Sequence, residues 1–314
     1  MNIENISVLG TGTMGHAMAI LSAQAGLNVT MYGRSNESLD RGFNSIKSSL
    51  NNLKCQKKVT EEKCQEILSR IKGVKTIKEA AQNADFIIES LAEDLELKQK
   101  IFNELDKLCD PQVILATNTS ALSPTAIAKY MKNPERVVVT QFWNPPQLIP
   151  LVEIVPGEKT SEETMVRTIE WAESIGKKAI RMEKECPGFI GNRLQVALLR
   201  EALYIVEQGW AKAEEVDKAI EYGHGRRLPC TGPLCTADLG GLDIFYEISS
   251  NLFKELCNSS KPSKLLQSKV EKGKLGSKTG EGIYNWPPDV LEKKEKERAE
   301  ILSYFLERDA IEKE

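Results

Sequence analysis

Val8-Leu9-Gly10-Thr11-Gly12-Thr13-Met14-Gly15 is the stretch that decides the fold predicted for this chain. It ends a short β-prone run at 5–9, and the Ala-rich amphipathic stretch at 14–25 predicts a helix directly after it. A second strand is predicted at 27–32. Strand, glycine turn, helix and strand in this order form a βαβ unit of the length typical of dinucleotide binding.

The three glycines have separate tasks in such a unit. Gly10 permits the tight turn, Gly12 lets the backbone approach a pyrophosphate, and Gly15 lets the helix pack on the strand. The phosphates then lie at the positive end of the helix dipole. A glycine-rich turn without a ligand is the alternative, which the strand–helix context disfavours. We therefore predict a phosphate site made by Gly10, Gly12, Thr13, Met14 and Gly15, with the adjacent His16 on a helix face and not in catalysis.

Strands and helices continue to alternate beyond this unit. The sequence predicts polar helices at 36–54 and 60–72 and buried strands at 84–89, 113–117, 136–140 and 151–155. This alternation favours a mostly parallel, doubly wound sheet. The predicted fold class is α/β, a Rossmann-type doubly wound sheet followed by an all-α helical domain.

The pattern changes at Cys186-Pro187-Gly188, where we place the domain boundary. A long helix is predicted at 189–208, and no β-run follows it. Its apolar residues cover more than one stripe, which is typical of a bundle core or a subunit interface. We therefore predict a dinucleotide-binding Rossmann domain at 1–186 and a helical dimerisation and substrate domain at 187–314, ending in a charged surface helix.

Composition excludes several other classes of protein. The 314 residues suggest about two domains of roughly 150 residues each. Forty-two basic and 45 acidic side chains leave a net charge of −3, which argues against a nucleic-acid partner. No run approaches the ~20 apolar residues of a membrane span, and no signal peptide is visible. Seven cysteines without CxxC spacing, and only two histidines, predict reduced thiols in a cytoplasmic protein and no metal site.

The end of the second predicted strand bears on cofactor choice. A carboxylate about 20 residues after the glycines normally binds the adenine ribose, but this chain reads Tyr32-Gly33-Arg34-Ser35. Gly33 removes a charge that would repel a 2′-phosphate, while Arg34 and Ser35 offer groups suited to phosphate oxygens. We predict NADP or NAD as cofactor, with a leaning to NADP. An ordinary surface arginine beside bound NAD is the alternative.

Several motifs in fixed order resemble the L-3-hydroxyacyl-CoA dehydrogenase family, and the 3-hydroxybutyryl-CoA dehydrogenases in particular. The resemblance runs nearly end to end, to Gly282-Ile283-Tyr284. Its landmarks after the glycine motif are Ala116-Thr117-Asn118-Thr119-Ser120, Phe142-Trp143-Asn144-Pro145-Pro146, Pro187-Gly188-Phe189-Ile190-Gly191-Asn192-Arg193, Gly232-Pro233-Leu234, Asp238-Leu239-Gly240-Gly241-Leu242-Asp243 and Gly276-Ser277-Lys278-Thr279-Gly280-Glu281-Gly282.

The resemblance implies an oxidoreductase of fatty acid metabolism that transfers hydride between NAD(P) and a short 3-hydroxyacyl-CoA or related hydroxy acid. It also implies a homodimer with the substrate in the cleft between the domains. It assigns Ser120 and Asn192 to the substrate oxygen, and Glu153 to the carboxylate that orients a catalytic histidine. The residues implied for the nicotinamide side of the cofactor are Glu93, Lys98, Ser120 and Asn144, and Asn118 is a further predicted cofactor-binding residue.

One position departs from this pattern. The family places its catalytic histidine directly before Phe142, where this chain has Gln141. Histidine suits alcohol oxidation because its pKa of ~6.5 lets it accept the hydroxyl proton near neutral pH, whereas an amide cannot relay a proton. Three interpretations are open: an engineered His→Gln substitution, a natural chain with altered or weak chemistry, and a non-catalytic dinucleotide-binding relative with a structural or sensing task. His224 is either a replacement proton carrier or a solvent-facing loop residue.

The substrate side has two interpretations. The Pro145-Pro146 pair followed by Leu148-Ile149-Pro150 resembles a branch of the family that acts on smaller hydroxy acids, such as the gulonate, carnitine and pyridine-derived dehydrogenases. The polar helices between 40 and 72 resemble instead the arm that contacts CoA in the acyl-CoA branch. Their lysines either bind CoA phosphates or form a solvated face: Lys47, Lys54, Lys57, Lys58 and Lys63.

Overall fold

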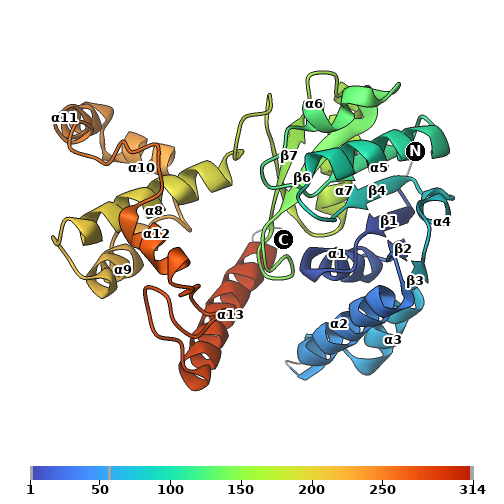
Figure 1. Ribbon diagram of the computed structural model, residues 1–314, viewed down its shortest axis with the longest axis horizontal. Coiled ribbons are helices and arrows are strands. Elements are labelled where there is room, and N and C mark those ends of the chain that lie inside the picture. Colours follow the sequence, from blue (N-terminus) through green and yellow to red (C-terminus); the bar gives the residue numbers. More distant parts are fainter. Residues whose placement is uncertain (1–2, 56–57, 312–314) are drawn as a thin grey trace. The chain divides into compact units, whose positions relative to one another are not determined.

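The predicted strand–turn–helix–strand order is present in the computed structural model of the protein, which describes residues 3–55 and 58–311 (Figure 1). Strand β1 (Asn5–Leu9) leads into helix α1 (Thr13–Gln24), and β2 (Asn28–Tyr32) returns beside β1 in parallel. The chain divides into two compact units, residues 1–190 with 299–314 and residues 191–298. Each unit is described by itself.

Within the described residues, eight strands form one sheet in the order β3-β2-β1-β4-β5-β6-β7-β8. All neighbours pair in parallel except β6 and β7, which are antiparallel. The remaining strands are β3 (Ile71–Val74), β4 (Phe86–Glu89), β5 (Ile114–Thr117), β6 (Val137–Phe142), β7 (Leu151–Pro156) and β8 (Lys178–Arg181). Strand order reverses direction between β1 and β4, so ligands are expected outside the carboxyl ends of these strands.

Side-chain alternation along the strands divides the core into two layers. Val8 packs with helices α1, α2 (Asn36–Cys55), α3 (Glu61–Ser69) and α7 (Glu162–Ser174) on one face. The next residue, Leu9, packs on the other face with α4 (Ile77–Ala81), α5 (Leu95–Leu108) and α6 (Pro124–Ile127). Because successive side chains of a strand point to opposite faces, a continuous apolar run is buried on both sides. The α/β prediction is confirmed.

Two edge strands were not predicted. The helix expected at 60–72 ends at Ser69, and Ile71 begins β3. β8 lies at the other edge of the sheet. Both strands have four residues; Lys72 and Gly73 interrupt the apolar residues of β3, and β8 begins with Lys178 and ends with Arg181. An edge strand this short and this exposed lacks the continuous apolar run that marks a buried strand.

The second unit is helical in its described residues, apart from isolated bridges at Gly276–Glu281 and Glu281–Asn285. Its helices are α8 (Gly191–Glu207), α9 (Ala213–Tyr222), α10 (Pro233–Gly240), α11 (Leu242–Leu252) and α12 (Lys264–Glu271), with a short turn η3 (His224–Arg226); α13 (Pro288–Ile311) follows as the predicted charged terminal helix. Among the residues described, no helix is both long and apolar enough to cross a membrane.

The prediction that α8 starts at residue 189 was wrong. Phe189 has φ 51°, in the left-handed region, and its side chain is 1% exposed. It packs against Val139, Val155 and Met182 in the first unit. Burial of this ring fixes a turn after Gly188, and the helix therefore begins only at Gly191.

Candidate active site

The glycine turn after β1 has two tightly packed positions and one open position. A Cβ on Gly10, which has φ +126°, would lie 2.4 Å from the Ser90 carbonyl oxygen. A Cβ on Gly15 would lie 2.2 Å from the Gly10 oxygen. A Cβ on Gly12 would meet nothing within 4 Å. Gly10 and Gly15 therefore satisfy packing within the protein, whereas Gly12 borders open space into which a ligand can fit.

The start of α1 adjoins this open space. Gly12 is the N-cap and supplies no side-chain cap, and Thr13 is exposed. First-turn amides of a helix have no partners within the helix, and with the helix dipole they favour an anion. Residues Gly10 to Gly15 therefore fit the pyrophosphate of a dinucleotide. His16 lies on the same helix, with Nδ1 2.9 Å from the Gly12 oxygen.

The end of β2 carries the residues predicted to select the cofactor. A Cβ on buried Gly33 would lie 2.7 Å from Ser38 Oγ, so a larger residue does not fit without a shift. Ser35 begins the turn into α2, where its Oγ accepts a hydrogen bond from the Ser38 amide at 3.2 Å. Arg34 is exposed and, within the described part of the chain, pairs with no carboxylate. Glu37 was not among the predicted residues; its pKa is lowered chiefly by a hydrogen bond from the Ser35 side chain.

At the carboxyl ends of β4 and β5, a group of charged side chains lies beside the glycine turn. Glu89 and Lys98 are 0% and 1% exposed, and Lys98 Nζ donates to both Glu89 oxygens at 2.7 Å. Lys98 Nζ also lies 3.4 Å from Glu93 Oε2, and Glu93 Oε1 accepts from the Ser120 amide at 3.1 Å. Three predicted residues, Glu93, Lys98 and Ser120, thus lie together. Glu89 was missed, although an acid ending the apolar run Phe-Ile-Ile-Glu is a signal for it.

Gln141 and Glu153 lie opposite each other in the antiparallel pair of β6 and β7. Such partners share a face of the sheet with their Cβ atoms ~4.5–5.5 Å apart. Gln141 is 5% exposed, and its Oε1 has no hydrogen-bond partner among the described residues. Glu153 is fully buried; Oε2 accepts from Trp143 Nε1 at 3.1 Å and Oε1 from the Ile190 amide at 2.9 Å. No sequence signal had singled out Trp143.

The loop after β6 is held from both sides. Asn118 Oδ1 accepts from the Phe142 amide at 2.9 Å, which ties the end of β5 to the end of β6. Asn144 is exposed and precedes a cis bond to Pro145. Beneath the loop lies buried Lys177, whose Nζ donates to the Pro146 and Ile149 carbonyl oxygens. Burial lowers the pKa of Lys177 to about 8.

Two predicted residues lie in the helical unit. Asn192 is half-buried in the first turn of α8, and His224 is exposed in η3. The remaining predicted catalytic residues, Ser120, Gln141 and Glu153, lie in the sheet-containing unit. Two lysines of the polar helices already have acidic partners, with Lys54–Glu61 at 2.8 Å and Lys63–Glu66 at 3.0 Å. Lys57 lies outside the described residues.

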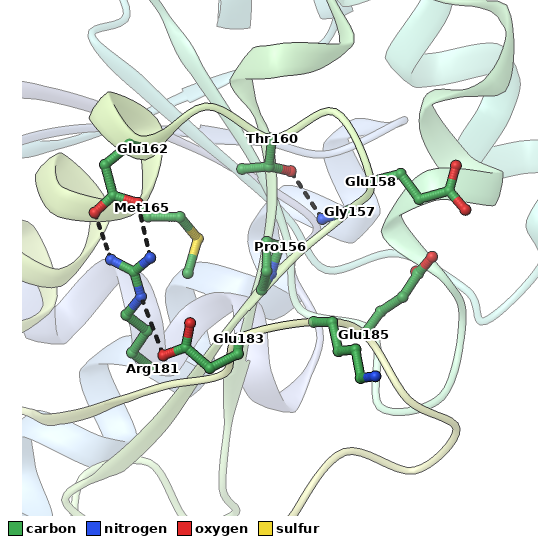
Figure 2. Close-up of a pocket in the computed structure, with 10 residues that line it drawn as sticks. Pro156, Gly157, Glu158, Thr160, Glu162, Met165, Arg181, Glu183 and Glu185 are labelled. Carbon is green, nitrogen blue, oxygen red and sulfur yellow. Dashed lines mark hydrogen bonds and ion pairs between the residues drawn. The ribbon is translucent and has the colours of Figure 1, made fainter.

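A pocket of about 360 Å³ lies around Pro156, at the carboxyl end of β7 (Figure 2). Because β7 is antiparallel to β6, this pocket lies away from the carboxyl ends of β4, β5 and β6, where the predicted site residues are. Figure 2 shows Arg181 between Glu162 and Glu183, with Arg181–Glu162 contacts of 2.5 and 2.7 Å. Arg181 is thus already bound by two carboxylates, and none of the predicted site residues lines the pocket. In the part of the chain that the structure describes, no cluster of His, Cys, Asp and Glu could hold a metal ion.

Comparison with known proteins covers both units. Residues 5–186 match the family model for the NAD binding domain of 3-hydroxyacyl-CoA dehydrogenase, and residues 188–286 match the model for its C-terminal domain. The chain is 37% identical over 287 residues to a probable 3-hydroxybutyryl-CoA dehydrogenase of Bacillus subtilis (strain 168), covering 91% of this chain and 98% of the relative.

A second group of relatives acts on a pyridine derivative. The chain is 31% identical over 306 residues to 5-formyl-3-hydroxy-2-methylpyridine 4-carboxylate 5-dehydrogenase of Mesorhizobium japonicum, covering 96% of each protein. A crystal structure of an enzyme with this activity, described as an NAD+ dependent dismutase, superposes with a TM-score of 0.88 at 30% identity and covers 99% of each chain.

Proposed function

Because the chain belongs to the 3-hydroxyacyl-CoA dehydrogenase family, with its NAD-binding and C-terminal domains, we propose that it transfers hydride reversibly between NAD(P) and a small hydroxy acid or short 3-hydroxyacyl-CoA. The observation that carries this proposal is the open space at Gly12 beside the uncapped start of α1. This space adjoins the sheet edge that holds Glu93, Ser120 and Gln141, so a dinucleotide bound there has its reactive end near these polar side chains.

The two kinds of relative support the two substrate classes. In sequence, the pyridine-carboxylate enzyme matches 96% of this chain, whereas the Bacillus relative matches 91%. This difference favours a small carboxylic acid with an aldehyde or alcohol group. Lys47 remains for CoA phosphates, since Lys54 and Lys63 have acidic partners and Lys58 Nζ donates a hydrogen bond to Ser303 Oγ at 2.7 Å.

We propose that the cofactor site accepts NADP as well as NAD. Gly33 leaves no carboxylate to repel a 2′-phosphate, and exposed Arg34 offers a planar cation to it. Glu37, held by Ser35, works against this preference because a carboxylate beside the ribose favours the 2′-hydroxyl of NAD.

The chemistry divides between the cofactor and the chain. When bound, the nicotinamide accepts or supplies the hydride. In the sheet-containing unit, Ser120 orients the substrate oxygen, and the Gln141 amide donates a hydrogen bond to it. Gln141 cannot take the hydroxyl proton, so this proton passes to water, and the step lacks the ~10²–10⁴-fold contribution of general acid–base catalysis. Turnover by this chain is therefore expected to be slow.

A specific observation supports a second candidate, a dinucleotide-binding protein without turnover. Glu153, the carboxylate that the resemblance assigns to a histidine, is bound by Trp143 and Ile190 instead. The contacts around Glu153 are therefore arranged without a proton acceptor at residue 141.

We further propose a homodimer in a reducing compartment, the cytoplasm. The helical unit exposes large apolar side chains that include Leu194, Val196, Leu234, Leu239 and Tyr246. All seven cysteines are free.

The deciding experiment titrates NADH and NADPH by fluorescence and then follows the absorbance of reduced nicotinamide with each candidate substrate. Acetoacetyl-CoA, free acetoacetate and the formylpyridine carboxylate represent the substrate classes. Binding with turnover supports the dehydrogenase, and binding with no turnover supports the second candidate. Absence of binding refutes both.

Gly12→Val is the matched control for this titration. Gly12 has φ −71°, which any residue adopts, and a Cβ there would have no atom of the protein within 4 Å. The variant should keep the melting temperature of the unmodified chain and lose cofactor binding, because the new side chain fills the space proposed for the pyrophosphate.

A further inference from the structure

We propose that Lys177 is a positioning residue: its buried amino group joins the two halves of the loop between β6 and β7, and so fixes Asn144, which the resemblance assigns to the nicotinamide side of the cofactor. This inference rests on the proposed function, because it gives a role in the proposed cofactor site to a side chain that binds only the protein. No motif in the sequence pointed to Lys177.

The loop at 143–150 depends on hydrogen-bond donors from outside. Its prolines have no backbone N–H, and they are Pro145, Pro146 and Pro150. The Leu148 and Ile149 amides both donate to the Pro145 oxygen at 3.0 Å, so neither serves the carbonyl of Pro146 or Ile149. Pro146 is buried, and a buried carbonyl without a donor costs free energy.

Lys177 supplies donors to both halves of this loop. Its Nζ donates to the Pro146 oxygen in the first half and to the Ile149 oxygen, at 3.3 Å, in the second half. An amino group has at least two N–H donors whether it is charged or neutral, so it can bind both carbonyls at once. One side chain thus joins the two halves of the loop.

The backbone of Lys177 belongs to the framework of the sheet. Lys177 follows α7, where its amide donates to the Ala172 oxygen at 3.0 Å, and it directly precedes β8. The Lys178 amide donates to the Pro150 oxygen at 2.9 Å, at the point where β8 starts to pair with β7. The loop is therefore tied to a helix and a strand, and not to another loop.

The same loop carries two side chains of the candidate site. Trp143 donates to Glu153 Oε2, and the next residue, Asn144, is exposed. Asn144 thus lies between two fixed points, the Trp143 contact and the Pro146 carbonyl that Lys177 holds. Loss of the second point would leave Asn144 fixed from one side only.

Stability is a poor reason for burying this amino group. Lys177 is 4% exposed, and its pKa is lowered to about 8 by burial, with no carboxylate among the described residues to oppose the shift. A buried ammonium without a carboxylate costs free energy. An apolar side chain of the same length would avoid this cost but would take the donor away from both loop carbonyls. The contact with the loop is what the amino group adds.

The test compares two neighbouring lysines in the full chain. Lys177→Met keeps the length of the side chain and removes its donors. Lys178→Met is the matched control, because Lys178 is the next residue and is exposed. Dissociation constants are measured for NADH and for ADP-ribose, which lacks the nicotinamide. Melting temperatures and the hydrogen exchange of the Leu148 and Ile149 amides are measured on the same proteins.

Lys177→Met should weaken NADH about tenfold and leave ADP-ribose within about twofold. It should also speed the exchange of the Leu148 and Ile149 amides by about tenfold, since the turn opens more often. Lys178→Met should change none of these quantities. Asn144→Ala should weaken NADH by itself, and Lys177→Met should add little in that background, because both changes act through the same contact.

Three results would overturn the proposal. Equal loss of NADH and ADP-ribose in Lys177→Met would show a general structural effect. Losses that add in Lys177→Met with Asn144→Ala would show that Lys177 acts by another route. Amide exchange in Lys177→Met equal to that in Lys178→Met would show that the amino group does not hold the loop. If Lys177→Met does not fold, Lys177→Gln replaces it: its N–H donor is one atom shorter, and it should give the same selective loss of NADH.

The outcome is separable from failure of the proposed function. If the unmodified chain binds neither NADH nor ADP-ribose, the proposed function is wrong, and amide exchange still decides whether Lys177 holds the loop. If the chain binds both ligands and Lys177→Met changes neither constant, only the positioning role is wrong.

Discussion

Trp143 Nε1 donates a hydrogen bond to Glu153 Oε2 at 3.1 Å, in the place where the resemblance expects a histidine–carboxylate contact. The other oxygen, Oε1, accepts from the Ile190 amide. Gln141 lies opposite Glu153 in the sheet and leaves its own Oε1 without a partner among the described residues. The site therefore differs from a histidine site in the surroundings of the carboxylate as well as at residue 141.

The first prediction concerns Gln141 and its sheet partner Glu153. Gln141→His should raise kcat by roughly 10²-fold, the contribution of a positioned general base, and leave cofactor affinity nearly unchanged. Adding Trp143→Phe should raise kcat further, because it frees Glu153 Oε2 to orient the ring. Steady-state kinetics on the single and double variants provide the measurement.

Glu153→Gln is the control for this gain. It should abolish most of the increase in the Gln141→His variant, since the carboxylate holds the tautomer and stabilises the cation of the ring. If the unmodified chain already turns over tens of times per second, a typical enzyme rate, another base operates, and His224 is the first residue to replace.

The second prediction concerns the choice between NADH and NADPH. Arg34→Ala should weaken NADPH selectively by about tenfold or more, because it removes a charge-assisted contact to the 2′-phosphate. Glu37→Gln should strengthen NADPH by roughly two- to fivefold, since exposed like charges interact by about 0.2–1 kcal/mol. Titration of both cofactors measures the change. The idea fails if NADH is preferred tenfold and Arg34→Ala has no effect.

The third prediction concerns pH and Lys177. Burial lowers the pKa of Lys177 to about 8 from an ordinary value of 10.5. Between these values the unfolded chain binds the proton and the folded chain does not, so this group makes the free energy of unfolding rise with pH. The slope is at most about 1.4 kcal/mol per pH unit.

Urea unfolding at pH 7 and at pH 9.5, for the unmodified chain and Lys177→Met, isolates this contribution. Buried Cys109, whose pKa is raised to about 11 by burial, has the opposite effect on stability but is present in both proteins. As the pH is raised from 7 to 9.5, the free energy of unfolding of the unmodified chain should therefore increase relative to that of Lys177→Met. An equal pH dependence in both would contradict the assignment.

Local pattern in the sequence was enough to predict the sheet and the glycine turn. Val8 and Leu9 are buried on opposite faces, and this is the reason for the continuous apolar run that marks the strand. The edge strand β3 has no such run, because Ile71 is its one buried residue and Lys72 and Gly73 are exposed. It also follows the polar helix α3 after a single residue, so the sequence shows no boundary between them. The start of α8 was wrong because the buried ring of Phe189 overrides helix propensity.

The candidate site was less predictable than the fold. Spacing along the chain gives no hint that Lys98 is enclosed by Glu89, since the contact depends on how α5 packs on β4. The contact of Trp143 with Glu153 depends on the orientation of a side chain in a loop, which no motif encodes. The resemblance named Glu153 and Gln141, but their pairing follows from the antiparallel register of two strands.

The last prediction concerns assembly. α8 has four large apolar side chains that are 44–58% exposed in the single chain, and Leu203 is the one residue buried among those described in this helix. Burial of such surface contributes about 25 cal/mol per Å² of apolar area, so a second copy of the chain should cover it. The protein should have twice the chain mass of 35.0 kDa in light scattering at micromolar concentration.

Leu194→Glu with Val196→Glu should give the mass of one chain, because two charges would be buried unpaired at the contact. Val166→Glu is the matched control: Val166 is 41% exposed on α7, in the sheet-containing unit, and its replacement should leave the dimer intact. A mass of one chain for the unmodified protein at all concentrations would refute the dimer. A dimer that survives Leu194→Glu with Val196→Glu would show that the contact does not involve α8, and the exposed residues of α10 and α11 would then be the next to test, beginning with Leu239 and Tyr246.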